Sequence, residues 1–285
     1  MEIISAIAVL RESLKGRQPV AFVPTMGNLH AGHLALVEQA RRYGRCVVVS
    51  IFVNPLQFGP GEDLASYPRT LEEDCRQLQA AGADIVFTPG VQELLPAPQQ
   101  FQVEPPAISG ELCGAYRPSH FRGVATIVLK LFNIVQPGYA VFGKKDYQQL
   151  HIIRAMVREL NVPVEIVAGE TVRAEDGLAL SSRNSYLNRA ERAEAPRLYR
   201  NLEQVRKAVT AGQRNFAALE SAAASDLTEH GWQVDYLSLR NADTLQPAQS
   251  GDAALVVLGA ARLGKTRLID NLEITAGQSV WPLML

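Results

Sequence analysis

The sequence predicts an α/β protein with a Rossmann-like, doubly wound parallel sheet and a smaller C-terminal α+β domain. Two observations predict this fold class. Apolar, strand-like runs alternate with helical segments over the first ninety residues, which is the order of a parallel sheet with right-handed crossovers. After about residue 175, two consecutive helical segments precede three strand-like segments. We therefore expect one domain over residues 1–174 and a second over residues 175–285.

Local signals define the elements of the first domain. The run CVVVSIFV (46–53) is continuous and rich in β-branched residues, as expected of a strand that is buried on both faces. Thr70 and Glu73 have the spacing of a capping box at the start of a helix. The expected elements are helix 3–15, strand 19–25, helix 33–44, strand 46–53, helix 70–82, strand 84–89, helix 121–135, strand 139–143, helix 146–161 and strand 164–169.

The second domain contains a segment that looks like a nucleotide site. GAARLGKT (259–266) matches G-x-x-x-x-G-K-[ST], the pattern of a phosphate-binding P-loop. A P-loop is followed by a helix, whereas RLIDNLEI alternates like a strand. We therefore expect two adjacent strands with Gly264 in a tight turn, and Lys265 as a surface charge. The expected elements are helices near 189–211 and 215–230, and strands 234–240, 254–264 and 266–274.

Composition excludes several classes of function. The net charge of −1 gives no basic surface for nucleic acid, so any nucleotide is expected to be a small molecule. Cys46, Cys75 and Cys113 are far apart and have no zinc-site spacing, which favours reduced thiols. No apolar stretch approaches the roughly 20 residues that span a bilayer. We expect a soluble, cytoplasmic protein that binds neither nucleic acid nor membranes.

The junction after the first long strand carries the strongest chemical signal. PTMGNLHAGH (24–33) leaves a strand, turns at Gly27 and enters a helix, and a helix N-terminus favours phosphate. His30 and His33 can lie on one face and donate to an α-phosphate as charge builds up. Capping or packing is the alternative for two such histidines, and a zinc site is weaker because no third ligand lies nearby. The HxGH pattern resembles the HIGH signature of nucleotidyl and adenylyl transferases.

Five segments together resemble the pantothenate synthetase family, and the match covers essentially the whole chain. The segments are TMGNLHAGH (25–33), FVNPLQFGPGEDLASYPRT (52–70), YRPSHFRGVATIVLKLFNIVQP (116–137), FGKKDYQQL (142–150) and GLALSSRN (177–184). The resemblance implies condensation of pantoate with β-alanine at the expense of ATP, through a pantoyl adenylate. Such chemistry needs positioning and charge neutralisation rather than an enzyme nucleophile.

The resemblance also implies an ATP site. His33 is implied as the proton donor and His30 as its companion, while Lys145 neutralises phosphate and Asp146 holds ribose hydroxyls. Arg183, with neighbouring serine hydroxyls, suits a leaving pyrophosphate. The implied ATP-binding residues are Met26, Gly27, Asn28, Leu29, His30, Ala31, Gly32, His33, Gly143, Lys144, Lys145, Asp146, Val172, Leu180, Ser181, Ser182 and Arg183.

Pantoate and β-alanine are expected at the end of the second strand. The resemblance places Gln57 at both substrates and Gln149 at pantoate, and the amide of Asn54 suits a small polyol acid. As alternatives, Asn54 can form a turn with the proline that follows it and Gln57 can be solvated. The gem-dimethyl group of pantoate needs an apolar wall, for which Pro24, Met26 and Phe142 are the candidates.

Magnesium is the second expected cofactor besides ATP. Asp74 is the preferred ligand, acting partly through water, because Glu73 has a structural role in the capping box and Gln77 lies one turn further on. The family's usual glycine in RPGHF is Ser119 here, which affects the geometry of that loop. Arg117 and His120 in the same loop are either substrate or lid residues, or they pack at the surface.

The resemblance implies a homodimer.

Two alternative functions are open. The nearest alternative function is another HIGH-type nucleotidylyl transferase that acts on a different small acid or a phosphorylated substrate, although the amides of NPLQ (54–57) do not suit a substrate phosphate. A nucleotide-binding module without catalysis is the second alternative.

Overall fold

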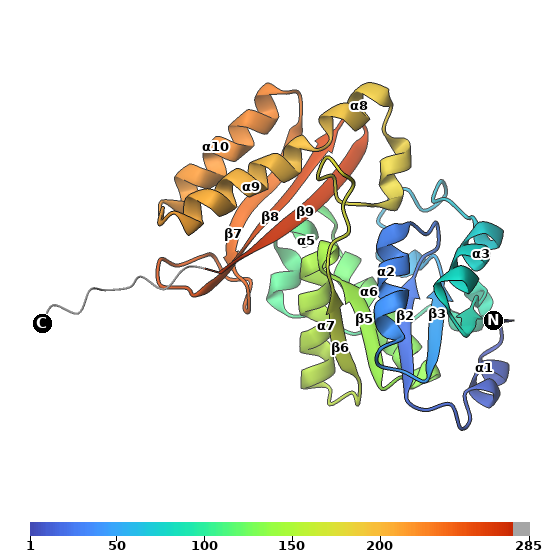
Figure 1. Cartoon of the computed structure of the whole chain (residues 1–285). Coiled ribbons are helices and arrows are strands. Elements are labelled where there is room, and N and C mark those ends of the chain that lie inside the picture. Colours follow the sequence, from blue (N-terminus) through green and yellow to red (C-terminus); the bar gives the residue numbers. More distant parts are fainter. Residues whose placement is uncertain (276–285) are drawn as a thin grey trace, which may run out of the picture. The chain divides into compact units, whose positions relative to one another are not determined.

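The computed structural model describes residues 1–275 and divides the chain into two compact units (Figure 1). The first unit comprises Met1–Val172 together with Leu180–Ser182, and the second comprises Arg173–Ala179 and the chain from Arg183 onward. The polypeptide therefore passes from one unit to the other three times, after Val172, after Ala179 and after Ser182.

The first unit is built on a six-stranded parallel sheet, which confirms the predicted fold class. Its strand order is β1-β4-β3-β2-β5-β6, and all neighbouring strands run parallel. The strands are β1 (Glu2–Ile4), β2 (Val20–Thr25), β3 (Cys46–Ile51), β4 (Ile85–Phe87), β5 (Tyr139–Gly143) and β6 (Glu165–Gly169). The helices are α1 (Ile7–Ser13), α2 (Ala31–Ala40), α3 (Leu71–Ala81), α4 (Val91–Leu94), α5 (Cys113–Tyr116), α6 (His120–Val135) and α7 (Tyr147–Glu159).

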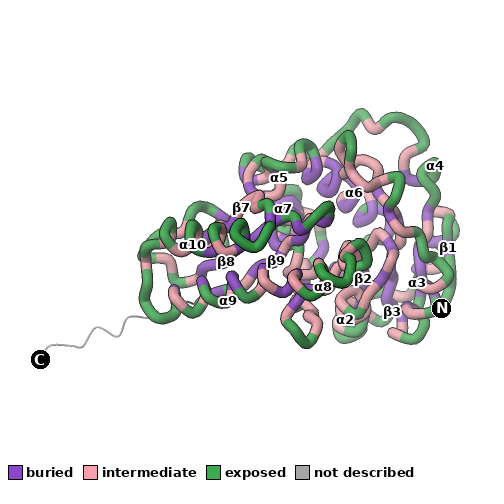
Figure 2. The backbone as a smooth tube through the Cα atoms, turned by 90° about the horizontal axis from the view of Figure 1, so that it is seen from above, coloured by how far each residue is buried: buried purple, intermediate pink, exposed green. Residues whose placement is uncertain are grey.

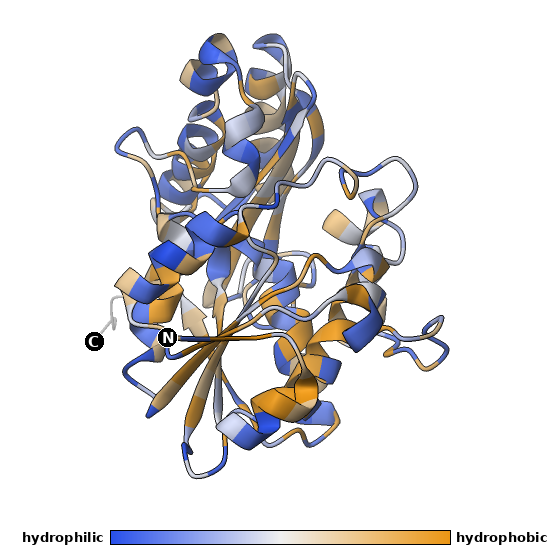
Figure 3. Cartoon of the chain, turned by 90° about the vertical axis from the view of Figure 1, so that its right-hand side faces the viewer, coloured by the Kyte–Doolittle hydropathy of each residue, from blue (hydrophilic) through white to orange (hydrophobic). Residues whose placement is uncertain are grey.

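Both faces of this sheet are buried, which is why β3 reads as a continuous apolar run. Val47 and Val49 pack in a core with residues of α2 and α3, while Cys46 and Val48 pack in the opposite core with residues of α6. Figure 2 shows buried backbone along the central strands, and Figure 3 shows their largely hydrophobic colouring. The loops at the carboxyl ends of the strands are therefore the parts left to bind ligands.

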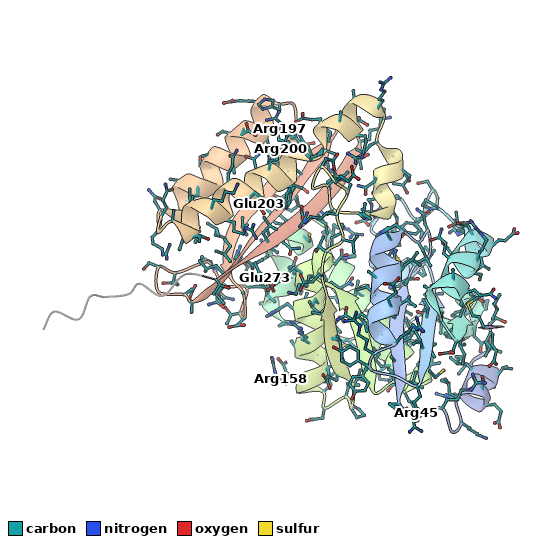
Figure 4. The ribbon with its side chains drawn as sticks, in the orientation of Figure 1. Arg45, Arg158, Arg197, Arg200, Glu203 and Glu273 are labelled. Atoms are coloured by element: carbon teal, nitrogen blue, oxygen red, sulfur yellow. The ribbon has the colours of Figure 1, made fainter. Side chains whose placement is uncertain are left out.

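The second unit is a three-stranded antiparallel sheet with two long helices. The strand order is β7-β8-β9, and the core joins residues of α9 and α10 to the sheet. Arg197, Arg200 and Glu203 lie along α9 (Figure 4), at a spacing of three that places them on one side of the helix. The elements are α8 (Arg189–Glu194), α9 (Arg197–Thr210), α10 (Phe216–Glu229), β7 (Gln233–Asn241), β8 (Ala254–Leu263) and β9 (Thr266–Thr275).

Three local predictions were wrong. Residues 3–15 do not form one helix, because residues 2–4 form β1 and pair with β4. The helix expected over 189–211 is interrupted at Pro196, whose ring and missing N–H disfavour a helix interior. The capping box at Thr70 is absent: Thr70 Oγ1 donates instead to Asp74, and Glu73 accepts from Arg76 and Gln77.

The GAARLGKT segment is a β-hairpin, as predicted. Leu263 of β8 pairs with Thr266 of β9, so Gly264 and Lys265 form a two-residue turn. Gly264 has φ +56°, and a positive φ at the first central position is typical of a type II′ turn. No helix follows within the described part of the chain, and Lys265 is exposed, so this match to the P-loop pattern binds no phosphate in the manner of a P-loop.

Candidate active site

A tight turn follows β2 and directs the chain into α2. Gly27 and Asn28 both have positive φ, +81° and +51° respectively, a conformation that glycine and asparagine tolerate better than other residues. The N–H of Gly27 donates to Oγ1 of Thr25 at 3.2 Å, and this hydroxyl in turn donates to the carbonyl of Ser50. The sequence TMGN therefore turns sharply at the carboxyl end of the sheet.

His30 and His33 form a reciprocal capping box at the start of α2. Nδ1 of His30 accepts from the N–H of Gly32 at 3.1 Å, and Nδ1 of His33 accepts from the N–H of His30 at 3.4 Å. Because each Nδ1 is an acceptor, each neutral ring carries its proton on Nε2. The two ring centroids are 4.1 Å apart. Two N–H donors are thus held together at a helix N-terminus.

Gly32 leaves room for this arrangement. A Cβ at Gly32 would lie 2.8 Å from Cε1 and 2.9 Å from Nδ1 of His30. A larger residue at this position of HxGH would therefore displace the capping ring of His30, whether or not a ligand approaches the backbone there.

Both histidines are held in the neutral form. Burial lowers the pKa of His30 to about 4, with a smaller contribution from the Lys145 ammonium. Burial also lowers the pKa of His33 to about 3, and the neighbouring His30 lowers it further. The Asp146 carboxylate opposes the shift in both rings. Lys145 and Asp146 of the β5–α7 junction are therefore near enough to the two imidazoles to change their pKa values.

The β5–α7 junction contributes a short 3₁₀ turn, η3 (Lys144–Asp146). Asp146 is the N-cap of α7, but its side chain makes no capping hydrogen bond and is exposed. Lys144 forms an ion pair with Glu170 at 2.7 Å. Of the two lysines, Lys145 is the one whose charge acts on the histidines.

The loop after β3 presents Gln57. It forms a 3₁₀ turn, η1 (Pro55–Gln57), capped by Asn54, whose Oδ1 accepts from the N–H of Leu56. Nδ2 of Asn54 donates to Oε1 of Gln57 at 2.9 Å, and Nε2 of Gln57 contacts Sδ of Met26 at 3.2 Å. The side chains of Gln57 and Met26, both predicted to bind substrate, therefore meet.

The N-terminal half of α6 supports η1. His120 contacts the carbonyl oxygen of Gln57 at 2.9 Å through Nδ1, so that this nitrogen carries the proton. Gly123 allows close approach, since a Cβ there would lie 2.1 Å from the carbonyl oxygen of Leu56. Arg117 forms a partly buried ion pair with Glu62 at 2.6 Å. Arg117 and His120 thus have supporting contacts, which favours the packing alternative over direct substrate contact.

Residues 180–182 join the turn that precedes α2. The N–H of Leu180 donates to the carbonyl of Val172 at 3.0 Å, and Oγ of Ser182 donates to the carbonyl of Asn28 at 3.0 Å. Val172 also lies near Gly32, at 4.0 Å from the position of an added Cβ. These residues, expected at ATP, belong to the first unit, and Ser182 binds its TMGN turn directly.

Comparisons with known proteins assign the chain that carries this site to a family. Residues 2–273 match the family model described as pantoate-beta-alanine ligase. The chain belongs to the pantoate-beta-alanine ligase family. It is accordingly an enzyme that joins pantoate to β-alanine.

Relatives and solved structures support this family assignment over nearly the full chain. A pantothenate synthetase of Nitrosospira multiformis is 62% identical over 96% of this chain and 99% of the relative. The structure of pantothenate synthetase from Thermus thermophilus is similar with a TM-score of 0.92 and 49% identity, covering 96% of this chain and all of the other. A pantoate-beta-alanine ligase from Francisella tularensis, solved with beta-gamma ATP and beta-alanine, has a TM-score of 0.81 and 32% identity, covering 95% and 97%.

Two of the residues predicted to bind substrate have other roles in this ligase. Asn54 is 1% exposed. Its Nδ2 donates to Oε1 of Gln57 and to the carbonyl of Gly123, and its Oδ1 accepts from the N–H of Leu56. The side chain therefore holds Gln57 rather than a ligand. Phe142 is 4% exposed and packs edge-on against Phe132 in the core. Of the three candidates for an apolar wall, Pro24 and Met26 are both partly exposed, and their contact with pantoate stays a prediction.

Gln149 and Arg183 are both partly exposed, and their predicted contacts with ligands are not tested by the structure. Gln149 is partly exposed on α7, next to the buried Gln148. Arg183 lies in the 3₁₀ turn η4 (Ser182–Tyr186), at the point where the chain enters the second unit. The contacts of these two side chains with ATP or pantoate stay predictions.

Sequence reasoning missed two residues that fix neighbouring segments of the first unit. Gly123 stands within the apolar helical run of α6, and a glycine inside a predicted helix is itself a signal of close packing. Gln148 donates to the carbonyls of Ile108 and Glu111 and accepts from the N–H of Cys113. No pattern distinguishes Gln148 from Gln149 in the sequence, because only the rotation of α7 decides which of them is buried.

Proposed function

We propose that this ligase uses ATP as its co-substrate and works in two steps through a pantoyl adenylate. The relative from Francisella tularensis that was solved with beta-gamma ATP and beta-alanine supports ATP as the nucleotide. The observation that carries the proposal is the histidine capping box at the N-terminus of α2, with the charge of Lys145 acting on it.

In the first step, a carboxylate oxygen of pantoate attacks the α-phosphorus of ATP and the bond to pyrophosphate breaks. Negative charge grows on the phosphoryl oxygens, and fixed donors stabilise such charge without reorganisation. The Nε2–H groups of His30 and His33 are such donors, and the N-terminus of α2 and Lys145 add positive potential. Because the pKa values of both rings are low, the histidines act as neutral hydrogen-bond donors.

In the second step, the amine of β-alanine attacks the acyl carbon of the adenylate and AMP leaves. By family resemblance, Gln57 binds both substrates, and its contacts with Asn54 and Met26 fix the orientation of its amide. Such placement lowers the entropic cost of bringing an amine to an acyl carbon. By family resemblance, Gln149 binds pantoate, and Arg183 with Ser181 and Ser182 binds the departing pyrophosphate.

Magnesium was expected with Asp74 as its ligand, but the residues present do not fit that role. Both oxygens of Asp74 already accept hydrogen bonds from backbone N–H groups. We derive no step through a metal held by Asp74.

The adenylate is tested by exchange of labelled pyrophosphate into ATP. We expect exchange to require pantoate but not β-alanine, whereas AMP should appear only when both are present. Exchange that depends on a phosphorylated alcohol instead of pantoate would favour another HIGH-type nucleotidylyl transferase, and exchange that requires β-alanine would contradict a free-standing adenylate.

His33→Ala is expected to lower the exchange rate about 10²-fold, the usual cost of losing one donor to a transition state. His230→Ala is the matched control, because this histidine ends α10 in the second unit and is exposed. Wild-type exchange in the His33 variant, measured by radiolabel incorporation, would show that this imidazole has no part in adenylation.

We further propose, on family resemblance alone, that the enzyme is a cytoplasmic homodimer. In residues 1–275, no helix has both the length and the apolar character needed to cross a bilayer. Sedimentation equilibrium of the purified chain measures the oligomeric state directly, and a monomer at micromolar concentration would contradict the dimer.

A further inference from the structure

Asp74 is a buried carboxylate whose partners are all hydrogen-bond donors. It lies in the first turn of α3 and is 1% exposed. Oδ2 accepts from the N–H of Asn28 at 2.9 Å, Oδ1 accepts from the N–H of Leu29 at 2.8 Å, and Oγ1 of Thr70 donates to Oδ2 at 3.2 Å. Charge-assisted bonds of this kind satisfy a buried carboxylate without a cation.

The backbone that Asp74 binds belongs to the turn that leads into α2. Gly27 and Asn28 have consecutive positive φ angles, so the turn depends on outside contacts to keep its shape. Asp74 binds the N–H groups of Asn28 and Leu29, and Ser182 binds the carbonyl of Asn28. Both sides of the turn are therefore held.

The fit between carboxylate and turn is close. A Cβ at Gly27 would lie 3.0 Å from Oδ2 of Asp74 and 3.0 Å from Cγ2 of Ile51. The residue immediately after the turn is His30, the N-cap of α2. A change in the direction of the Asn28 and Leu29 peptides would therefore move the start of α2 and both imidazoles.

We propose that Asp74 is a positioning residue for adenylation, which binds the Asn28–Leu29 backbone and thereby places His30 and His33. It acts through the turn and holds no magnesium. This inference rests on the proposed function for the part played by the histidines, whereas the contact between Asp74 and the turn stands independently of it. Displacements of about 1 Å at a reacting centre can cost about 10²-fold in rate.

The first test is Asp74→Asn, with Glu73→Gln as the matched control. Glu73 is the neighbouring carboxylate, but it is half-exposed and binds Arg76 and Gln77. Pyrophosphate exchange is measured against magnesium concentration, and β-alanine attack on synthetic pantoyl adenylate is measured separately. We expect Asp74→Asn to lower the maximal exchange rate at least about tenfold. The half-saturating magnesium concentration and the attack of β-alanine should stay within about twofold of wild type, and Glu73→Gln should match wild type throughout.

Two outcomes would overturn the proposal. If Asp74→Asn raises the magnesium requirement and saturating magnesium restores the rate, Asp74 is a metal ligand. If both half-reactions fall equally, Asp74 supports the whole unit rather than the turn.

A second variant tests the turn without removing the carboxylate. Gly27→Ala places a methyl group against Asp74, whereas Gly16→Ala carries a similar cost at φ +76° with no atom within 4 Å. We expect Gly27→Ala to reproduce the loss of exchange and Gly16→Ala to leave it unchanged. Equal exchange rates in the two variants would contradict the proposal.

Amide hydrogen exchange gives a readout that does not depend on catalysis. In Asp74→Asn, protection of the Asn28 and Leu29 amides should fall at least about tenfold, because one carboxylate oxygen becomes a donor that faces an N–H group. Protection of Val47 and Val49 in β3 should be unchanged. Unchanged protection at Asn28 and Leu29 would overturn the proposal that Asp74 holds the turn. This outcome is independent of whether the chain adenylates pantoate.

Discussion

Asn54, Asp74 and Gln148 are almost fully buried, with 1%, 1% and 3% of their surface exposed. Each of them binds backbone groups of a neighbouring loop. At the level of single residues, these three buried polar side chains therefore hold neighbouring backbone, whereas Gln57 and His33, the residues proposed to bind substrates, are partly exposed.

Ser50 differs from these three buried polar residues. Its side chain is completely buried near the end of β3, and Oγ has no hydrogen-bond partner within the described residues. A buried hydroxyl without a partner costs about 1–3 kcal/mol. We predict that Ser50→Ala raises the free energy of unfolding by about 1 kcal/mol, as measured by urea denaturation, while Ser66→Ala on an exposed loop changes it by less than about 0.5 kcal/mol.

Ser119 occupies a position that suits glycine. Its φ is +64°, in the left-handed region, and its side chain makes no capping bond to α6. A non-glycine residue in this conformation destabilises the folded state by about 1–2 kcal/mol. Glycine avoids this cost but also raises the conformational entropy of the unfolded chain, which offsets part of the gain in stability. We predict that Ser119→Gly stabilises the protein by about 0.5–1 kcal/mol in the same assay. Ser119→Ala keeps the Cβ and should be neutral, so an equal gain in both variants would contradict the backbone explanation.

At the level of elements, the packing of α6 against η1 controls the loop that carries Gln57. The contact depends on Gly123, where a Cβ would lie 2.1 Å from the carbonyl oxygen of Leu56. Alanine normally stabilises a helix relative to glycine. A loss of stability on replacing Gly123 by alanine would therefore be due to the contact with η1 and not to helix propensity. The loop and the helix must separate to admit one methyl group.

We therefore predict that Gly123→Ala destabilises the protein by about 1–3 kcal/mol, the usual cost of overpacking. The KM for pantoate should rise roughly tenfold because Gln57 moves with η1. Steady-state kinetics and urea denaturation measure the two effects. Gly110→Ala, which meets no atom within 4 Å, should change neither, and an unaltered KM in Gly123→Ala would separate η1 from pantoate binding.

At the scale of the whole molecule, His30, His33 and His120 make the free energy of unfolding depend on pH. Burial lowers the pKa of His120 to about 4, and the Arg117 guanidinium lowers it further. The pKa values of His30 and His33 are lowered as well. Between about pH 4 and the ordinary histidine pKa of about 6.5, the unfolded chain binds more protons than the folded chain, so stability falls as the pH decreases.

For His120 alone, we expect a loss of about 1–2 kcal/mol between pH 7 and pH 5. Urea denaturation at a series of pH values should show this slope, and His120→Asn should reduce it. An identical slope in the variant would mean that other groups account for the acid sensitivity.

Much of this architecture could be predicted from sequence, because buried parallel strands and helical periodicity leave local patterns. β1 could not, since its three residues become a strand only by pairing with β4, some eighty positions away. The histidine pair was recognisable at HxGH, yet its tautomers required the capping geometry. Asp74 was predicted to bind magnesium, and a sequence records its carboxylate but not the Asn28 and Leu29 N–H groups that donate to it.

The three passages of the chain between units have a consequence for any attempt to separate them. A fragment that ends at Val172 lacks the Ser182 hydroxyl that binds the TMGN turn. A fragment that begins at Arg183 lacks Arg173, the bidentate partner of the buried Asp270. A fragment that keeps the whole first unit must extend to Ser182 and then takes Arg173–Ala179 from the second unit, so no single cut yields two complete units.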